Sequence, residues 1–192
     1  MGKVVVTEFI TLDGVIQAPG GGEGFEHDGR SFKFDRGDDG NKFKVDELQA
    51  ADAQLLGRVT YQGFARAWPN MGGDPFGDKM NSMPKYVVSS TLADADASWT
   101  NSTVIRDDVV NQIAWLKDKV EGDILVAGSA KLVQFLADHD LVDEYRLMVF
   151  PVALGTGKRL FADLKAPTTL RLVDTRSVGP DGVMILTYQP KR

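Results

Sequence analysis

The feature that most constrains this chain is the regular alternation of short apolar runs with segments that carry helical stripes. Runs rich in β-branched residues, typical of buried strands, alternate with stretches whose apolar residues recur at three or four positions. The expected strands are 4–10, 54–57, 86–88, 104–105, 124–126 and 145–152. The expected helices are 41–53, 61–64, 75–83, 109–120 and 129–136. This order predicts an α/β fold with a mostly parallel sheet.

Two segments depart from this alternation. Residues 170–178 and 183–189 flank the turn sequence Gly-Pro-Asp-Gly at 179–182, which predicts an antiparallel hairpin at the edge of the sheet. Residues 18–40 are rich in glycine and are expected to form a long irregular loop. The expected helix caps are Thr60 and Asp107. Because no repeat or second domain is visible, we expect residues 1–192 to form a single domain.

Composition removes several classes of function. The chain has no cysteine and two histidines, His27 and His139, so no metal site is expected. Its net charge of −5 argues against non-specific binding to nucleic acid, which requires a basic surface. No signal peptide is recognisable, and no apolar run approaches the ~18 residues of a membrane span. We therefore expect a cytoplasmic protein, without membrane or nucleic-acid partners, that binds a small molecule.

Familiar catalytic signatures fail at their defining positions. Gly155 to Arg159 resembles a phosphate-binding loop, but Arg159 stands where the loop needs Ser or Thr. A calcium loop starting at Asp35 would place Gly37 at a ligand position. Ser129 lacks the flanking glycines of a nucleophile elbow. ATPase, calcium-binding and hydrolase functions are therefore disfavoured.

Three strand ends carry groups suited to phosphate. Gly57 to Tyr61 combines a glycine with Arg58, a bidentate donor, and Thr60, a hydroxyl at a helix start. Ser89-Ser90 offers two hydroxyls, and Gly128 to Ala130 brings small residues to a helix amino terminus. Taken alone, each of these three segments is also typical of an ordinary surface loop or helix cap. Since ligands of open α/β sheets lie beyond the carboxyl ends of the strands, the three together predict a ligand with two or three phosphates, such as a dinucleotide.

Six segments, in this order along the chain, resemble the dihydrofolate reductase superfamily and, within it, bacterial proteins similar to the reductase domain of riboflavin biosynthesis. The segments are Thr11–Gly14 (TLDG), Leu55–Tyr61 (LLGRVTY), Lys85–Ser89 (KYVVS), Ile124–Ser129 (ILVAGS), Leu141–Glu144 (LVDE) and Pro151–Phe161 (PVALGTGKRLF). The last is the most specific and favours the riboflavin-type branch. The resemblance implies a three-layer sandwich, with helices on both faces of a central mixed, mostly parallel sheet.

The resemblance also implies NADPH as cofactor and assigns roles to the strand ends. Arg58 would lie near the adenosine 2′-phosphate, with Ser89 and Ser90 beside the adenosine phosphate. The backbone around Glu8 and Phe9, with Ile16, would face the nicotinamide. The residues expected to contact the cofactor are Glu8, Phe9, Ile16, Gly57, Arg58, Val59, Thr60, Ser89, Ser90, Gly128, Ser129 and Ala130.

The catalytic and substrate groups follow less directly from the sequence. Asp13 is a candidate for a catalytic or orienting role, its alternative being a turn residue. Phe25, His27 and Trp68 are candidates for the substrate pocket. The alternative for His27 is an exposed loop position, and the alternative for Phe25 and Trp68 is packing in the core. Asn41 stands where the folate enzymes carry a carboxylate. Candidate cations for a substrate phosphate are Arg30, Lys33, Arg36 and Lys158, each also readable as a surface charge.

These inferences predict an NADPH-dependent reductase that transfers hydride to a small heterocycle, pterin-like or pyrimidine-like. One alternative is the riboflavin-pathway reductase, acting on a phosphoribosylamino-pyrimidine. Another is a protein that binds NADPH without catalysis, since no acid for protonating the substrate is evident. Riboflavin-type relatives pair through their carboxyl-terminal strands, so a homodimer through the hairpin at 170–189 is also expected.

Overall fold

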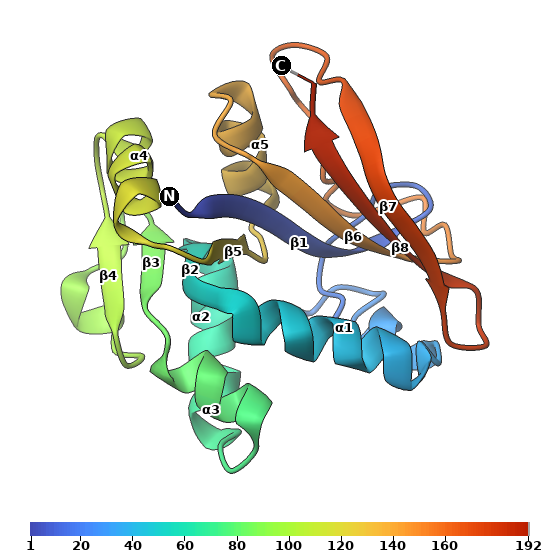
Figure 1. The fold of residues 1–192 in the computed structure, drawn as a ribbon. Helices are drawn as coiled ribbons and strands as arrows, with labels where there is room; N and C mark the ends of the chain where they lie inside the picture. The colour runs from blue at the N-terminus through green and yellow to red at the C-terminus, as the bar shows by residue number, and fades with distance from the viewer. Residues whose placement is uncertain (192) are drawn as a thin grey trace.

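The expected alternation forms one sheet of eight strands in the computed structural model, which describes residues 1–191 (Figure 1). The strands are β1 (Lys3–Thr11), β2 (Ala51–Gly57), β3 (Lys85–Val88), β4 (Ser102–Ile105), β5 (Asp123–Val126), β6 (Glu144–Phe150), β7 (Leu170–Val178) and β8 (Val183–Pro190). Their order across the sheet is β4-β3-β2-β5-β1-β6-β8-β7. All neighbours are parallel except β6·β8 and β8·β7, so the hairpin closes the sheet as predicted.

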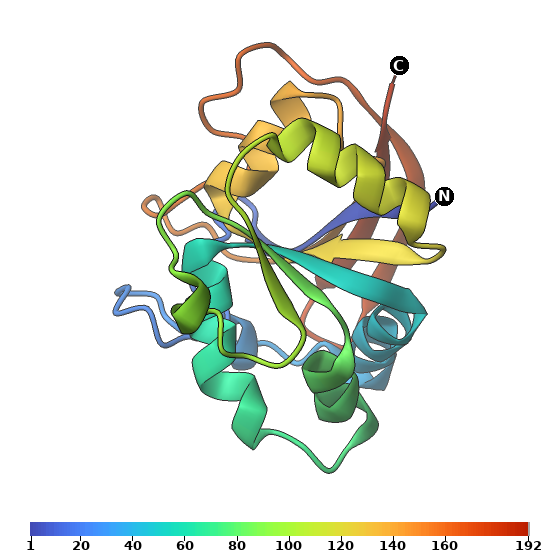
Figure 2. The ribbon, with the colours of Figure 1, turned by 90° about the vertical axis from the view of Figure 1, so that its left-hand side faces the viewer.

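Helices cover both faces of the sheet and make three layers (Figure 2). The helices are α1 (Gly37–Ala50), α2 (Arg58–Ala67), α3 (Pro75–Ser82), α4 (Val109–Lys119) and α5 (Ala130–Asp138). Single turns of 3-10 helix add η1 (Arg30–Lys33), η2 (Trp68–Asn70) and η3 (Asp94–Asp96). Figure 2 shows α4 and α5 on one face of the sheet and α1, α2 and α3 on the other.

Strand β1 divides the core because its side chains alternate between the two faces. Val4, Val6 and Ile10 belong to the apolar cluster that includes the buried residues of α4 and α5. Val5 belongs to the cluster on the opposite face, with residues of α1, α2 and α3. Burial on both sides explains why this strand reads as a continuous apolar run.

The pairing of β1 leaves an opening in the sheet. β1 pairs with β5 only from Lys3 to Val6, whose last partner is Val126. On its other edge, β1 pairs with β6 from Val5 to Thr11. The second half of β1 therefore has one edge that no strand covers, and this edge faces the cavity described below.

Several predicted boundaries are wrong. Helix α1 begins at Gly37, inside the expected loop, and ends at Ala50, because Ala51 and Ala53 are buried in β2. Thr60 does not cap α2, whose N-cap is Gly57. Asp107 does not cap α4, whose N-cap is Asp108, and the Asp108 side chain accepts from Asn111 Nδ2 (2.7 Å) and makes no capping bond to a helix amide. Within residues 1–191, no helix has the length and apolarity needed to cross a membrane.

Candidate active site

A cavity of about 1750 Å³ opens where the parallel strands end. Its wall contains the residues that follow β2, β3 and β5 and the residues of β1 beside the opening in the sheet. The three strand ends predicted from the sequence therefore meet at one cavity. All twelve residues expected to contact the cofactor line it: Glu8, Phe9, Ile16, Gly57, Arg58, Val59, Thr60, Ser89, Ser90, Gly128, Ser129 and Ala130.

One part of the wall, the strand-end half, consists of residues 57–60, 89–91 and 127–131. Its two glycine segments touch each other. The Gly57 amide donates a hydrogen bond to the Gly128 carbonyl (3.3 Å), and a Cβ on Gly57 would lie 2.3 Å from Ser129 Oγ. Gly128 has φ +96°, and a Cβ there would lie 2.8 Å from Thr60 Oγ1. Side chains are thus excluded where two helices, α2 and α5, begin.

Cations surround the strand-end half. Arg58 is exposed at the start of α2, and within residues 1–191 its guanidinium has no hydrogen-bond or ion-pair partner. Arg106, just after β4, also lines the cavity, but it is bonded to Asp94 (2.8 Å). Sequence reasoning missed Arg106, although a basic residue directly after a strand is the signal that identified Arg58. Ser89 is buried, and its Oγ accepts the amides of residues 91 and 92.

The other part of the wall, the helical half, is built from α1, α2, α3 and the segment after η2. Near β1 it contains a buried ionic cluster. Glu47 Oε2 accepts hydrogen bonds from the Thr7 hydroxyl (2.8 Å) and the Lys44 ammonium, and Lys44 also donates to Thr7 Oγ1 (2.6 Å). Arg146 lies 3.7 Å from the other Glu47 oxygen. Glu47 therefore serves as an anion fixed by two cations, a role that the sequence did not reveal.

The remainder of the helical half is aromatic. Trp68 lines the cavity as expected, with Phe64 and Phe76 on either side. Its ring lies 6.4 Å from that of Phe64 and 5.5 Å from that of Phe76, and Met71 adds a fourth apolar side chain. Such a wall suits a flat, largely apolar ligand surface.

Glu8 lies between the two halves. Its side chain is buried, and Oε1 has no hydrogen-bond partner within residues 1–191. Burial raises the pKa of Glu8 from 4.5 to about 8, and nearby Lys44 and Arg30 lower it less than burial raises it. The sequence identified this position for its backbone. A carboxylate inside the apolar run VVVTEFI was the signal that its side chain is unusual.

Asp13 lies outside the cavity lining. Its carboxylate accepts hydrogen bonds from the Thr11 hydroxyl (2.6 Å) and from the amides of Gly155 (2.7 Å) and Leu154 (3.2 Å). Those bonds, the Thr11 bond first, lower the pKa of Asp13 to about 2. Asp13 thus joins two loops as an anion. This position fits the turn role left open by the sequence and does not support the catalytic role.

Two predicted substrate residues, Phe25 and His27, also lie outside the cavity lining. Their rings pack edge-on with 5.4 Å between centroids, and His27 Nε2 lies 3.6 Å from Glu26 Oε1. Among the predicted phosphate-binding cations, Arg30 is wrong, since its buried guanidinium donates to the carbonyls of Val15, Gln17 and Phe9. Of the other three predicted cations, Arg36 and Lys158 line the cavity and Lys33 does not.

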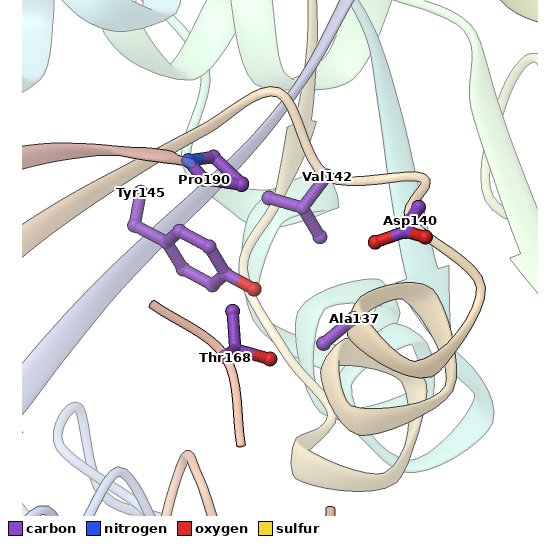
Figure 3. A pocket seen from close by; sticks show the side chains of 6 residues that line it. All are labelled: Ala137, Asp140, Val142, Tyr145, Thr168 and Pro190. Atoms are coloured by element: carbon purple, nitrogen blue, oxygen red, sulfur yellow. The ribbon is translucent and has the colours of Figure 1, made fainter. Parts of the chain in front are cut away.

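A second pocket lies on the α5 side of β6 and β8, away from this cavity (Figure 3). Its volume of about 10 Å³ is the space of a single water molecule. In Figure 3 the Tyr145 hydroxyl points into it toward Thr168, and burial raises the pKa of Tyr145 to about 12. The pocket is too small for an organic ligand. Within residues 1–191, no group of three or more His, Asp or Glu side chains is arranged as a metal site.

Comparison with known proteins agrees with the fold described above. Residues 2–184 match the family model described as RibD C-terminal domain. The uncharacterized protein YyaP of Bacillus subtilis (strain 168) is 31% identical over 191 residues, which cover 97% of this chain and 94% of that protein. The uncharacterized protein YwjB of the same organism is 31% identical over 179 residues, 92% of each chain.

Solved structures share the fold at lower identity. A candidate riboflavin biosynthesis protein from Shewanella sp. PV-4 superimposes with a TM-score of 0.77, 22% identity and 100% coverage of both chains. Dihydrofolate reductase from Enterococcus faecalis, complexed with NADP(H), gives a TM-score of 0.58 at 18% identity, covering 100% of this chain and 98% of that one. The dihydrofolate reductase-like fold predicted from the sequence is confirmed.

Proposed function

The chain belongs to the RibD C-terminal domain family, and from this premise we propose that it is an NADPH-dependent reductase of small heterocycles. The cofactor supplies a hydride, and a pterin-like or pyrimidine-like ring accepts it. The observation that carries the proposal is the meeting of three phosphate-suited strand ends at one end of a cavity whose other end is aromatic.

The residues of the strand-end half suit a dinucleotide. A Cβ at Gly57 or Gly128 would fill the approach between the two helix starts, so glycine keeps that approach open to a phosphate chain. Arg58, exposed and unpaired within the described residues, would bind the 2′-phosphate bidentately. Within this proposal Thr60 and Ser129 add hydroxyls, and Ser89 and Ser90 bind the adenosine end.

The helical half suits the substrate. Trp68, Phe64 and Phe76 would stack on a planar ring, and the Lys44–Glu47 pair would fix polar edges of that ring. The protein's contribution is orientation and exclusion of water.

A narrower candidate is reduction of a phosphoribosylamino-pyrimidine. A Thermotoga maritima enzyme of similar fold is described as a deaminase and 5-amino-6-(5-phosphoribosylamino)uracil reductase, and this chain spans 57% of it. Arg36 favours this candidate: it lines the cavity, is half-buried, and has no carboxylate partner within residues 1–191. Its Nε donates to Asn41 Oδ1 (2.7 Å), and a guanidinium without an anionic partner would bind a phosphate.

The test is oxidation of NADPH, followed by its absorbance, with a panel of dihydropterins and of ribosylaminopyrimidines with and without phosphate. We expect turnover with at least one ring class. A preference for the phosphorylated pyrimidine that is lost in Arg36→Met supports the narrower candidate. Binding of NADPH without turnover on any member would favour a non-catalytic binding protein instead.

We also propose a homodimer. The edge strand β7 exposes Leu172 and Val173, 48% and 47% accessible, beside an unpaired backbone edge. Pairing with a second copy would cover both. Light scattering should give twice the mass of the chain, and Val173→Lys should lower it to one chain. A mass of one chain for the wild type would contradict the dimer.

A further inference from the structure

Glu8 occupies the opening in the sheet. The last pair between β1 and β5 is Val6 with Val126, and from Ala127 onward the neighbouring chain turns away to line the cavity. Glu8 is two residues beyond this last pair. It lines the cavity with 6% of its surface accessible, and its Oε1 is buried without a partner within residues 1–191. A buried polar atom without a partner costs free energy unless a ligand satisfies it.

The side chain points to the face of the sheet that carries α5. Val6 and Ile10, the residues two before and two after Glu8, both pack in the cluster that includes α5. Thr7 points the opposite way and is bonded to Glu47 of α1. Alternation along β1 therefore places the Glu8 carboxyl on the face of the sheet that carries Ala130, and not on the face that carries Trp68.

Within residues 1–191, no charged side chain makes an ion pair with Glu8. Lys44 is bonded to Thr7 and Glu47, and the Arg30 guanidinium is bonded to main-chain carbonyls. The other charged residues lining the cavity are Glu23, Arg36, Glu47, Arg58, Arg66, Arg106, Lys131, Lys158, Arg159 and Asp163. Burial outweighs the opposite charges of Lys44 and Arg30 and holds the pKa of Glu8 at about 8, so at pH 7 the group is mostly a neutral acid.

The backbone groups expected to face the nicotinamide are partly used within the protein. The Phe9 carbonyl accepts a hydrogen bond from Arg30 (3.2 Å). The Ile16 amide donates to the Lys158 carbonyl (2.9 Å). A primary carboxamide needs one donor for its oxygen and acceptors for its two N–H bonds. A neutral carboxylic acid offers one donor and one acceptor side by side, and an ionised one offers only acceptors.

We propose that Glu8, as a neutral carboxylic acid, binds the carboxamide of the reduced nicotinamide, its O–H donating to the amide oxygen and its carbonyl accepting from the amide NH₂. The inference rests on the proposed use of NADPH. It makes Glu8 a cofactor-positioning residue, and it makes binding of the cofactor depend on the protonation of one side chain.

The test is the dissociation constant of NADPH, measured by calorimetry from pH 7 to 9.5, a range above the second pKa of the 2′-phosphate. For a ligand that binds only the protonated form, affinity falls with the protonated fraction, so the wild type should bind about tenfold more weakly at pH 9 than at pH 7. Glu8→Gln, whose amide also donates and accepts, should bind with a constant that varies less than about twofold. Glu26→Gln, which removes an exposed carboxylate outside the cavity lining, should keep the wild-type response.

A second measurement does not depend on any variant. The reduced 3-acetylpyridine analogue of NADPH has a methyl group in place of the amide NH₂ and cannot donate. The wild type should bind it about fivefold more weakly than NADPH at pH 7. Because both cofactors would bind the protonated form of Glu8, both affinities should fall together, and the fivefold ratio should persist at pH 9.5.

The outcomes separate the two proposals. If the wild type binds NADPH at pH 7 but shares its pH response with Glu8→Gln, or treats the two cofactors alike, the assignment of Glu8 is overturned and the cofactor proposal stands. If the wild type binds no NADPH at pH 7, the proposed function is overturned, and the role of Glu8 with it.

Discussion

The two halves of the cavity are built in different ways. The strand-end half uses backbone amides, glycines and hydroxyls within a few residues of each strand end, such as Gly57 and Thr60. The helical half uses side chains brought together from distant segments, such as Thr7 and Glu47, 40 residues apart. A site of the first kind follows from local sequence, because strand, turn and helix start are adjacent in the chain. A site of the second kind follows only from the tertiary structure.

The largest effect is expected in the helical half. Glu47→Ala leaves the mostly buried Lys44 ammonium without an anionic partner within residues 1–191, while Arg146 keeps Asp123 and Glu144, and it should lower the free energy of unfolding by about 3 kcal/mol. Asp46→Ala, its neighbour on α1, breaks only the exposed pair with Lys42 and should cost less than about 1 kcal/mol. Urea unfolding measures both. Equal costs would show that the ionic cluster does not stabilise this half.

Glycine replacements come next and act on the strand-end half. Gly128→Ala places a Cβ 2.8 Å from Thr60 Oγ1 at a positive φ, so it should cost about 1–3 kcal/mol and weaken NADPH binding at least tenfold. Gly63→Ala, in α2 with no atom within 4 Å of the new Cβ, should be neutral or stabilise by about 0.5–1 kcal/mol. Thermal unfolding and calorimetry measure the pair. Wild-type affinity for NADPH in Gly128→Ala would contradict the assignment of the strand-end half to the cofactor.

Arg58→Ala should leave folding unchanged and weaken NADPH binding 10- to 100-fold, about 1.4–2.7 kcal/mol, with little effect on NADH. The reason is that only NADPH carries the 2′-phosphate. Arg106→Ala should weaken NADPH binding less, because Arg106 is already paired with Asp94. Equal losses for NADPH and NADH in the Arg58 variant would remove Arg58 from the 2′-phosphate.

A pH dependence of stability tests the position of Glu8 between the two halves. Its pKa in the folded chain, about 8, is above its unfolded value of 4.5. Its contribution is therefore complete below about pH 4.5 and is lost as pH rises to about 8. Glu8→Gln should gain stability relative to the wild type between pH 5 and 8, and urea midpoints at both pH values test it. A constant difference would mean that Glu8 is not held neutral.

Local signals explain which parts of the fold and the site could be predicted. The turn at 179–182 and the ends of β2, β3 and β5 carry their own local signals, and the structure has them where the sequence predicts, although the first residue of α2 differs. The end of α1 was not, because Ala51 and Ala53 favour helix locally and become strand through burial between β3 and β5. The raised pKa of Glu8 depends on its burial in the tertiary structure, of which the apolar run VVVTEFI is only an indirect signal.

Asp13 shows the limit of the same approach for catalysis. A carboxylate after the first strand is typical of both a turn and an active site. The contacts that decide between them come from Leu154 and Gly155, more than 140 residues away in the chain. The sequence makes Phe25 and His27 candidates for the substrate pocket, yet from their loop the cavity lining takes residues 17–23 and the two residues Ser31 and Phe32.

The most direct test of the account is a calorimetric titration of the wild-type protein with NADPH and, separately, with NADH at pH 7. We expect binding of one NADPH per chain, at least tenfold tighter than NADH, because Arg58 and the strand ends are assigned to a phosphate-rich ligand. Absence of binding by both cofactors would leave the fold unchanged and contradict the assignment of the cavity as a reductase site.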